Sequence, residues 1–261
     1  MKSRGLLSVL TYSEKREDIL FLLLKEPRTL TELKDHFNIT SPEILPRIKE
    51  LVMKNLIYKQ NGKYVLTPIG KVIGKFYQQF IETLYVIERN EEFWKGDVVD
   101  EIPPLFLERI SELGNCKLLE NRLENIYEPH ADFSEKILKS KYVKEIAPIL
   151  HPKCPLLFLD IAQPEKSISL IVTKNVLERL KKEHNETVKK SLSKNTNLFL
   201  LNHEIKLALI VSDMFLSLSL FSRNGPSYSQ RNLISFDKSA VKWGEELFMY
   251  YRGLSEEIRS V

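Results

Sequence analysis

The feature that most constrains the fold is an ordered series of local signals in the first third of the chain. Ser13 and the apolar run after it predict a helix over 13–25, which Glu26-Pro27 ends. The segment "TLTELKDHF" predicts a second short helix over 29–37, and "NITS" predicts a tight turn. A third helix is expected over 41–56. Two helices joined by a short turn are typical of a helix-turn-helix motif.

The signals that follow predict a wing. Asn61-Gly62 stands between two β-prone runs in "LIYKQNGKYVL", which is a strong hairpin signal. Thr67 and Pro68 then have the pattern of a helix start, so a long helix is expected over 67–89. The order helix, helix, turn, helix, hairpin, helix predicts a winged helix-turn-helix domain over residues 1–90.

The third helix, "SPEILPRIKEL", contains two prolines. We expect Ser41 to cap it and Pro42 to be its first helical residue, where a missing amide costs nothing. Pro46 cannot donate the next hydrogen bond, which predicts a bent or 3₁₀-like first turn with the regular helix resuming at Pro46. The apolar side chains expected to face the domain core are Ile44, Ile48, Leu51 and Val52.

The positive charge is concentrated in this part of the chain. Residues 1–90 hold 15 Lys and Arg against 10 Asp and Glu, a formal charge of +5, whereas the other residues hold 24 against 25 and carry −1. Residues 41–75 alone hold seven basic side chains against Glu43 and Glu50. A local basic patch on a nearly neutral protein favours a polyanionic partner, here double-stranded DNA, although a solvated face has the same composition.

The predicted DNA contacts come from three places. In a helix-turn-helix, the start of the second helix enters the major groove, and cations near it meet phosphates. Arg47 is the best candidate for a bidentate contact to guanine. The full predicted set is Lys34 on the second helix, Thr40, Ser41, Glu43, Arg47 and Lys49 on the third, and Lys59, Asn61 and Lys63 on the wing.

Composition excludes several other classes of protein. The longest apolar runs are far below the 18 residues of a membrane span, and the N-terminus lacks a signal peptide's apolar core and cleavage site. The two cysteines, Cys116 and Cys154, form neither a metal framework nor a disulfide scaffold. Nine glycines and no phosphate-loop motif argue against a nucleotide site. We therefore expect a cytoplasmic protein without cofactor, metal or membrane partner.

Residues 91–261 alternate element types. Residues 91–103 break the helical pattern, and we place the domain boundary there. Helices are expected at "PLFLERISEL", "ADFSEKILKSK", "CPLLFLDIAQ" and "KNVLERLKKEHN", and strands at "KLLE", "YVKEIAP" and "SISLIVT". The runs "TNLFLLN", "KLALIVSD" and "FLSLSLF" are expected to form an antiparallel meander, before a long closing helix over 237–258. Trp243, Phe248, Tyr250 and Tyr251 on that helix are expected in the core. This pattern predicts an α/β domain with a mixed sheet.

Both parts of the chain resemble known regulators. Residues 10–88 are similar to the winged-helix module of archaeal and bacterial regulators. The segment "IVSDMFLSLSLFSRNGPSYSQRNLISFDKSAVKWGEELFMYY" resembles the C-terminal sensor region of the archaeal methanogenesis-regulatory-protein family. The matching residues are Leu220, Phe221, Gly225, Tyr228, Asp237, Ala240, Trp243, Gly244, Glu246, Leu247 and Phe248, whereas Ser229 replaces a more usual Asp. The resemblance implies a transcriptional regulator with a sensor or dimerisation domain over residues 91–261.

An enzymatic alternative rests on a looser resemblance to half of a phospholipase-D-like domain. Such a phosphodiesterase uses a His-x-Lys-x-x-x-x-Asp motif, and the nearest residues here are His203, Lys206 and Asp213. The lysine is one place late, which in a strand turns it to the other face. His130, His151, His184 and Cys154 have no diagnostic spacing. We expect no enzyme; the alternatives are a nuclease or a winged-helix protein-interaction adaptor.

The predicted whole is a winged helix-turn-helix followed by an α/β domain, an α+β or α/β chain that reads operator DNA as a homodimer. The second domain is expected to dimerise the chain or to bind a small-molecule or anionic effector, and the helix 67–89 to link the two domains.

Overall fold

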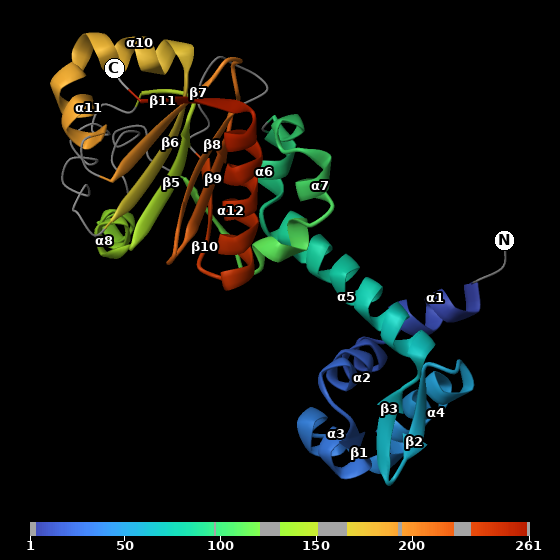
Figure 1. Cartoon of the computed structure of the whole chain (residues 1–261). Helices are drawn as coiled ribbons and strands as arrows, with labels where there is room; N and C mark the ends of the chain where they lie inside the picture. Colours follow the sequence, from blue (N-terminus) through green and yellow to red (C-terminus); the bar gives the residue numbers. More distant parts are fainter. Residues whose placement is uncertain are drawn as a thin grey trace. The chain divides into compact units, whose positions relative to one another are not determined.

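The chain forms two compact units, Met1–Glu82 and Thr83–Val261. The computed structural model describes residues 4–96, 98–120, 131–150, 166–192, 195–221 and 231–259 (Figure 1). The predicted boundary at residue 90 lies just beyond the end of the helix that passes from one unit to the other. None of the helices in these ranges is both long and apolar enough to cross a membrane.

The first unit is a winged helix-turn-helix, as predicted. Its elements in chain order are α1 (Arg4–Thr11), α2 (Glu14–Lys25), β1 (Arg28–Thr29), α3 (Leu30–Phe37), α4 (Ser41–Met53), β2 (Ile57–Gln60), β3 (Lys63–Leu66) and α5 (Pro68–Arg89). The strands form a small antiparallel sheet in the order β1-β3-β2. Sequence signals missed α1 and the two-residue strand β1.

The apolar faces of α2, α3 and α4 meet in one core. Ile19, Leu20, Leu33, Ile44 and Leu51 are all fully buried there. Two expectations for α4 are wrong. Val52 is 42% exposed, and the helix ends at Met53 because Asn55 adopts a left-handed conformation with φ of 54°. That turn lets the Leu56 amide return to the Leu51 carbonyl and starts the wing.

Pro46 does not break α4. The helix is continuous from Ser41 to Met53, so the predicted 3₁₀-like first turn, with the regular helix resuming only at Pro46, is wrong. Its cap is also Thr40, not Ser41, which makes Pro42 the second helical residue. An interior proline costs about 3 kcal/mol. Burial of Ile44, Ile48 and Leu51 stabilises the helix by about 2 kcal/mol each, which exceeds that cost.

The wing confirms the Asn-Gly signal. Asn61 and Gly62 both have positive φ, 50° and 79°, as a two-residue hairpin turn requires. After the wing, the Thr67 hydroxyl donates to the Asn55 carbonyl at 2.7 Å and accepts the Gly70 amide at 2.8 Å. Thr67 therefore caps α5 and links the start of α5 by a hydrogen bond to the turn that follows α4.

The second unit is built on an eight-stranded mixed sheet in the order β11-β7-β6-β5-β8-β9-β10-β4. The strands are β4 (Lys117–Glu120), β5 (Tyr142–Ala147), β6 (Ser167–Thr173), β7 (Thr196–Leu201), β8 (Leu207–Ser212), β9 (Leu216–Leu220), β10 (Arg231–Ser235) and β11 (Ser255–Ile258). Strands β5, β6 and β7 run parallel, and the other pairs are antiparallel. The prediction of a mixed sheet is confirmed.

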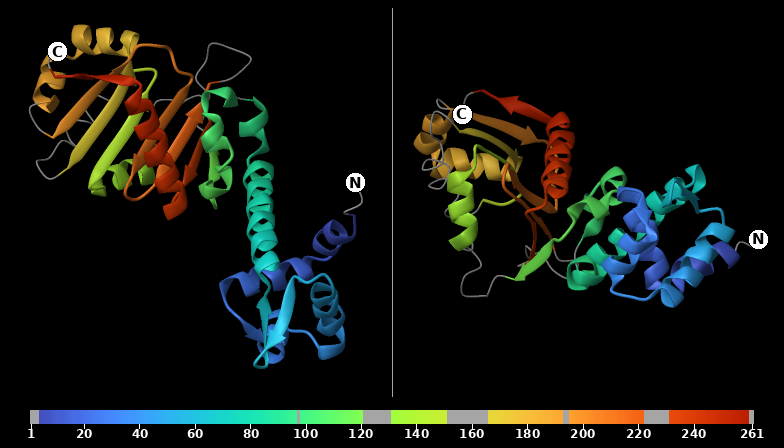
Figure 2. Two further views of the ribbon diagram at one scale, coloured as in Figure 1. Left: turned by 45° about the vertical axis from the view of Figure 1, so that its right-hand side comes forward. Right: turned by 90° about the horizontal axis from the view of Figure 1, so that it is seen from below.

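Helices cover both faces of this sheet (Figure 2). On one face α12 (Lys238–Gly253) packs together with α6 (Glu91–Gly96), α7 (Pro104–Leu107) and the 3₁₀ turn η2 (Ile110–Leu113); on the other lie α8 (Ala131–Lys139), α10 (Lys174–Glu183) and α11 (Asn185–Leu192). Side chains of β6 therefore alternate between the two faces of the sheet. Ile168, Leu170 and Val172 pack in the core on one face, and Ile171 packs in the core on the other.

The closing helix is packed as expected, with one exception. Trp243, Phe248 and Tyr251 are at most 5% exposed, whereas Tyr250 is 43% exposed. Trp243 Nε1 also donates to the Phe106 carbonyl at 3.0 Å.

Several predicted elements of this unit are wrong in detail. The meander consists of β8, β9 and β10, whereas β7 pairs in parallel with β6 on the other side of β5. The closing helix ends at Gly253, and β11 follows it. Residues 91–103 contain α6 and the 3₁₀ turn η1 (Val99–Glu101), and "PLFLERISEL" forms two short turns of helix. The sequence signals missed β10 and β11.

Some predictions lie outside the described residues. These are the helix over 154–163 and the residues His130, His151, Cys154, Gly225, Tyr228 and Ser229.

Candidate nucleic-acid interface

The start of α4 is closed by a side chain of its own first turn. The Thr40 amide and hydroxyl both donate to Glu43 Oε2, each at 2.8 Å. These two bonds, from the Thr40 backbone and hydroxyl, hold the pKa of Glu43 below its ordinary value. The Glu43 carboxylate therefore already occupies the place where a helix start otherwise attracts an anion.

Behind this tip, two basic side chains lie on the outer part of α4. Arg47 is half-buried, and its guanidinium donates back to the Glu43 carbonyl. Lys49 is exposed, and Ser41 is half-buried at the first helical position. Arg47 is thus held along the helix in the free protein, with its terminal nitrogens next to the tip.

The charges around α4 are unevenly paired. Glu50 forms an ion pair with Arg16 of α2, whose Nε also donates to the Val9 carbonyl at 2.7 Å. With Glu43 engaged by Thr40, both acidic side chains of residues 41–75 have partners. In the described structure, by contrast, no ion pair involves the seven basic ones, which are Arg47, Lys49, Lys54, Lys59, Lys63, Lys71 and Lys75. Residues 41–75 consequently retain a net positive charge.

The wing presents the predicted lysines at its tip. Lys59 pairs with Tyr64 and Lys63 with Gln60 across the hairpin, so the two lysines point to opposite faces of it. Lys59, Asn61 and Lys63 are all exposed, and Lys59 Nζ lies 5.9 Å from the centre of the Tyr64 ring. Strand β2 contacts α4, so the wing lies beside this helix (Figure 1).

One further cation belongs to this surface. Lys15 of α2 is near enough to the Glu43 carboxylate to help lower its pKa, after the two Thr40 bonds. Sequence reasoning missed Lys15 because it is 28 positions from Glu43, and only the packing of α2 against α4 brings it there. Lys34 is half-buried on α3. All nine predicted contact residues therefore lie on α3, α4, the residue before α4 and the wing of a single unit.

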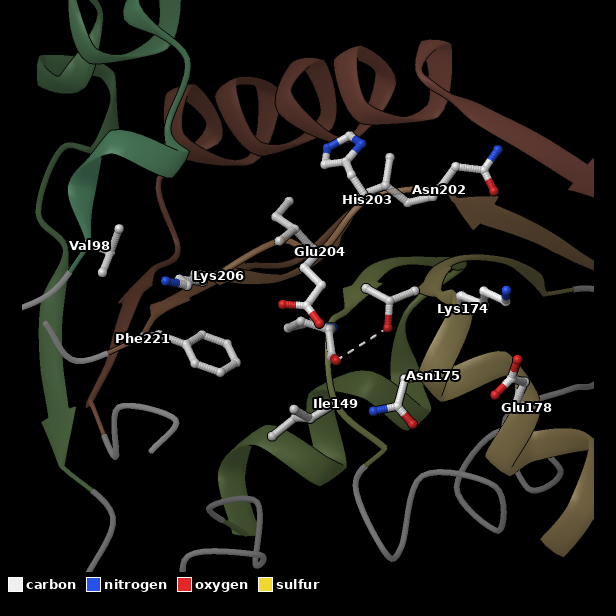
Figure 3. Close-up of a pocket in the computed structure, with 14 residues that line it drawn as sticks. Val98, Ile149, Lys174, Asn175, Glu178, Asn202, His203, Glu204, Lys206 and Phe221 are labelled. Atoms are coloured by element: carbon white, nitrogen blue, oxygen red, sulfur yellow. Dashed lines mark hydrogen bonds between the residues drawn. The ribbon is translucent and has the colours of Figure 1, made fainter. Parts of the chain in front are cut away.

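The second unit contains a cavity of about 980 Å³. It lies where the parallel strands β5, β6 and β7 end, which is the usual ligand position in an open α/β sheet. Its wall combines apolar and polar side chains from segments that follow these strands, with Val98 and Phe221 at one side (Figure 3). Thr173, at the end of β6, is buried and donates to the Pro148 carbonyl at 3.5 Å.

The labelled side chains of this cavity differ in direction. Figure 3 shows Glu204 and Asn175 directed toward the interior and His203 directed away from Asn175. His203, Glu204 and Lys206 are exposed in the loop between β7 and β8. The cavity wall is therefore mixed in charge, with Lys174 and Lys206 balanced by Glu178 and Glu204.

The residues of the phospholipase-D-like alternative are not brought together. His203 and Lys206 precede β8, and Asp213 follows it, at the opposite end of that strand. Six residues of strand separate the two ends by about 20 Å. Asp213 Oδ1 instead accepts the Lys141 amide at 2.9 Å.

The architecture defines a class: a winged helix-turn-helix unit joined to a separate α/β unit with a cavity at its parallel strand ends. Two family models match the chain: the N-terminal domain of methanogenesis regulatory protein FilR1 over residues 4–85, and the middle domain of FilR1 over residues 126–254. The chain therefore belongs to the family of methanogenesis regulatory protein FilR1.

One individual relative carries the same family name. The methanogenesis regulatory protein FilR1 of Methanothrix harundinacea (strain 6Ac) is 27% identical over 255 residues, which cover 96% of this chain. The chain spans 57% of that relative's length. Among solved structures, TrmBL2, an archaeal chromatin protein, aligns over 99% of this chain and 100% of its own with 16% identity and a TM-score of 0.45. An O-methyltransferase family protein from Burkholderia thailandensis covers 77% of this chain and 65% of its own, with 10% identity and a TM-score of 0.25.

Proposed function

We propose that this chain is a cytoplasmic transcriptional regulator that binds double-stranded DNA through α4 and the wing. The observation that carries the proposal is the positive surface around α4 and the wing of a winged helix-turn-helix, where none of the basic side chains of residues 41–75 forms an ion pair in the described structure. Such a surface attracts phosphates, while the exposed part of α4 is of a size to enter the major groove. The family name, a regulatory protein, agrees with this function.

The nine predicted residues divide into two roles in this proposal. Arg47 and Lys49 on α4 face base edges once the Arg47 guanidinium leaves the Glu43 carbonyl. Lys34, Lys59, Asn61 and Lys63 contact the phosphate backbone, which positions the protein without reading sequence. Thr40, Ser41 and Glu43 lie at the tip, where the carboxylate of Glu43 keeps phosphates away from the helix start.

The test is binding of the purified chain to its own upstream DNA, measured by fluorescence anisotropy at several salt concentrations. Affinity should fall steeply with salt through counterion release. Lys63→Ala should weaken binding to all DNA alike and reduce the salt slope by about 1, whereas Arg47→Ala should cost about 1–3 kcal/mol on the preferred sequence only. Lys181→Ala, on the exposed side of α10, is the matched control. An absence of binding at low salt rules out the regulator.

We further propose that the second unit is a non-catalytic sensor. Its cavity at the ends of β5, β6 and β7 has the position and size of a small-molecule site. An effector bound there would shift the population of DNA-binding conformations of a homodimer. The separation of His203 and Lys206 from Asp213 favours this role over a phosphodiesterase. Hydrolysis of a generic phosphodiester that is lost in His203→Ala would establish the enzymatic alternative instead.

The winged helix as a protein-interaction adaptor remains the second alternative. The basic wing favours DNA over a protein partner, and the salt dependence separates the two. An adaptor would show no salt-dependent affinity for DNA.

A further inference from the structure

The outer face of α5 carries a row of exposed apolar side chains, interrupted at one position by the half-buried Thr83. Ile69, Val72, Phe76 and Phe80 are 56%, 53%, 71% and 56% exposed, and Ile87 is 37% exposed. With Thr83, these positions are spaced 3, 4, 4, 3 and 4 residues apart. At 100° per residue they fall within a sector of about 80°. We name these residues the α5 row. All of them belong to one helix, so their alignment follows from helix geometry.

The α5 row is separate from the face that packs inside the first unit. Gly70, Gly74 and Tyr77 lie on that buried face, where Gly74 approaches Leu20 and Leu24 and the Tyr77 hydroxyl donates to Glu17. The row thus has no role in holding the first unit together. Exposed apolar rows of this kind mark interaction surfaces.

The spacing fits another helix. Steps of 3, 4 and 4 residues form an eleven-residue period, close to that of a straight α-helix, so the row stays in line over the whole of α5. A straight apolar row about 27 Å long, from Ile69 to Ile87, matches a helix of similar length. Taking about 200 Å² for a whole aromatic side chain, the four most exposed residues offer roughly 400 Å² per copy. That is about half of what one partner contributes to a standard interface, so a dimer of standard size requires the flanking side chains to contribute the other half.

The row is self-complementary when two copies run antiparallel. Its positions are nearly symmetric about residue 78, so that Phe76 meets Phe80 of a second copy, and Ile69 meets its Ile87. The flank of the row is also asymmetric in charge. Lys71 and Lys75 lie in the first half of α5, and Glu82 lies on the same flank in the second half, with Arg89 at the end of the helix, and all four are exposed. In an antiparallel pair the same flanks face each other, which brings each Lys75 beside the second copy's Glu82.

We propose that two copies of this chain associate by antiparallel pairing of their α5 rows. This deepens the homodimer of the proposed function by naming its interface. A two-fold axis across the middle of α5 makes the contact isologous and closed, as in most homodimers. The charge pattern disfavours parallel pairing, because Lys75 and Glu82 would then be separated by two turns of helix.

The first test measures the association of the full chain by sedimentation velocity over a wide range of concentrations. Wild type should be a dimer, and Phe76→Glu should raise the dimer dissociation constant by about a hundredfold or more, because it places an unpaired charge in an apolar seam. Leu105→Glu, which changes a 59% exposed leucine of α7, is the control and should leave the dimer intact. Phe76 is too exposed for this change to unfold the unit, which circular dichroism checks.

The second test fixes the orientation. Lys75→Glu and Glu82→Lys should each weaken the homodimer of that variant, because each substitution places like charges beside each other. When the two variants are mixed, native mass spectrometry should show heterodimers above the statistical half. A monomeric wild type, a dimer unaffected by Phe76→Glu, or a statistical mixture overturns the proposal.

DNA binding is measured on the same samples, so the two proposals fail separately. If the wild-type chain is a monomer that binds operator DNA, the α5 interface proposal fails and the regulator proposal stands. If Phe76→Glu breaks the dimer but the wild-type dimer does not bind DNA, the regulator proposal fails and the α5 interface stands.

Discussion

Replacing Glu145 by glutamine is expected to stabilise the second unit at neutral and alkaline pH. Glu145 is half-buried on β5, between Leu170 of β6 and Ile210 of β8. These cross-strand neighbours are apolar, and burial raises the pKa of Glu145 from 4.5 to about 7. The carboxylate is therefore less stable in the folded chain than in the unfolded one, and glutamine keeps the shape of the acid without its charge.

The sign and size follow from this pKa. Below about pH 4.5 the acid is neutral in both states, and the variant should match wild type. As the pH rises toward 7, the unfolded chain loses its proton first, so wild type loses stability and the variant does not. The full change in pKa corresponds to about 3 kcal/mol. Water reaches part of this side chain, so we expect about 2 kcal/mol in favour of Glu145→Gln at pH 8.

The assay is urea unfolding between pH 4.5 and 8, followed by tryptophan fluorescence. Both tryptophans, Trp94 and Trp243, belong to the second unit, so the signal reports that unit alone. Glu88→Gln, at an exposed position of α5, is the control and should change nothing. A free-energy difference between Glu145→Gln and wild type that stays constant with pH would refute the reasoning.

Three further predictions concern packing and the α4 tip. Gly70→Ala should destabilise the first unit by about 2 kcal/mol or more, because its Cβ would lie 1.9 Å from the Leu56 carbonyl oxygen. Thermal unfolding followed by circular dichroism measures this loss. Gly253→Ala is the control and should not lower stability, because its Cβ meets nothing within 4 Å. Cys116 is buried, and burial raises its pKa to about 11, so in a Cys154→Ser background iodoacetamide at pH 8 should label it only on unfolding. Glu43→Gln should lower the hydrogen-exchange protection factors of amides at the start of α4. Acidification of wild type should do the same once the rates are corrected for the slower intrinsic exchange at low pH, because the lowered pKa of Glu43 means that its stabilising effect is lost as pH falls.

Local signals predicted the first unit well because its turns depend on neighbouring residues. Asn61-Gly62 fixes the wing through two positive φ angles, and Thr67 caps α5 through its own hydroxyl. The error at Pro46 has a different origin. The rule for interior prolines is local, whereas the burial of Ile44, Ile48 and Leu51 that overrides it comes from α2 and the rest of the core.

The second unit shows where such reasoning ends. β7, β8 and β9 were each predicted as strands of one antiparallel meander, which holds for β8 and β9 but not for β7. Nothing local marked β7 as different, because "TNLFLLN" is as apolar as "KLALIVSD". What places β7 beside β6 is the connection through α10 and α11, which returns the chain in parallel. β11 follows a turn at Leu254, has the pattern "SEEI", and becomes a strand only because β7 offers an unpaired edge.

The candidate DNA surface was predicted by residue but not by role. Thr40 and Ser41 were predicted among the DNA contacts, at a helix start whose free amides can hold a phosphate. The same Thr-x-x-Glu spacing occurs at α3, where Thr29 and Glu32 form a capping box, and that spacing is visible in the sequence. Applied to Thr40 and Glu43, it predicts the engaged carboxylate that the structure contains.

This capping changes how the proposed contact with DNA must work. A helix start with free amides binds a phosphate and holds the helix end against the backbone. With Glu43 already there, a phosphate would meet a carboxylate, so the tip of α4 is repelled from the backbone on either side of the groove. The attraction then comes from Lys59 and Lys63 on the wing and from Lys34, at some distance from the tip. Repulsion at the tip and attraction beside it together favour the centre of the major groove for α4, where Arg47 is one turn behind Glu43 and can exchange the Glu43 carbonyl for a base edge.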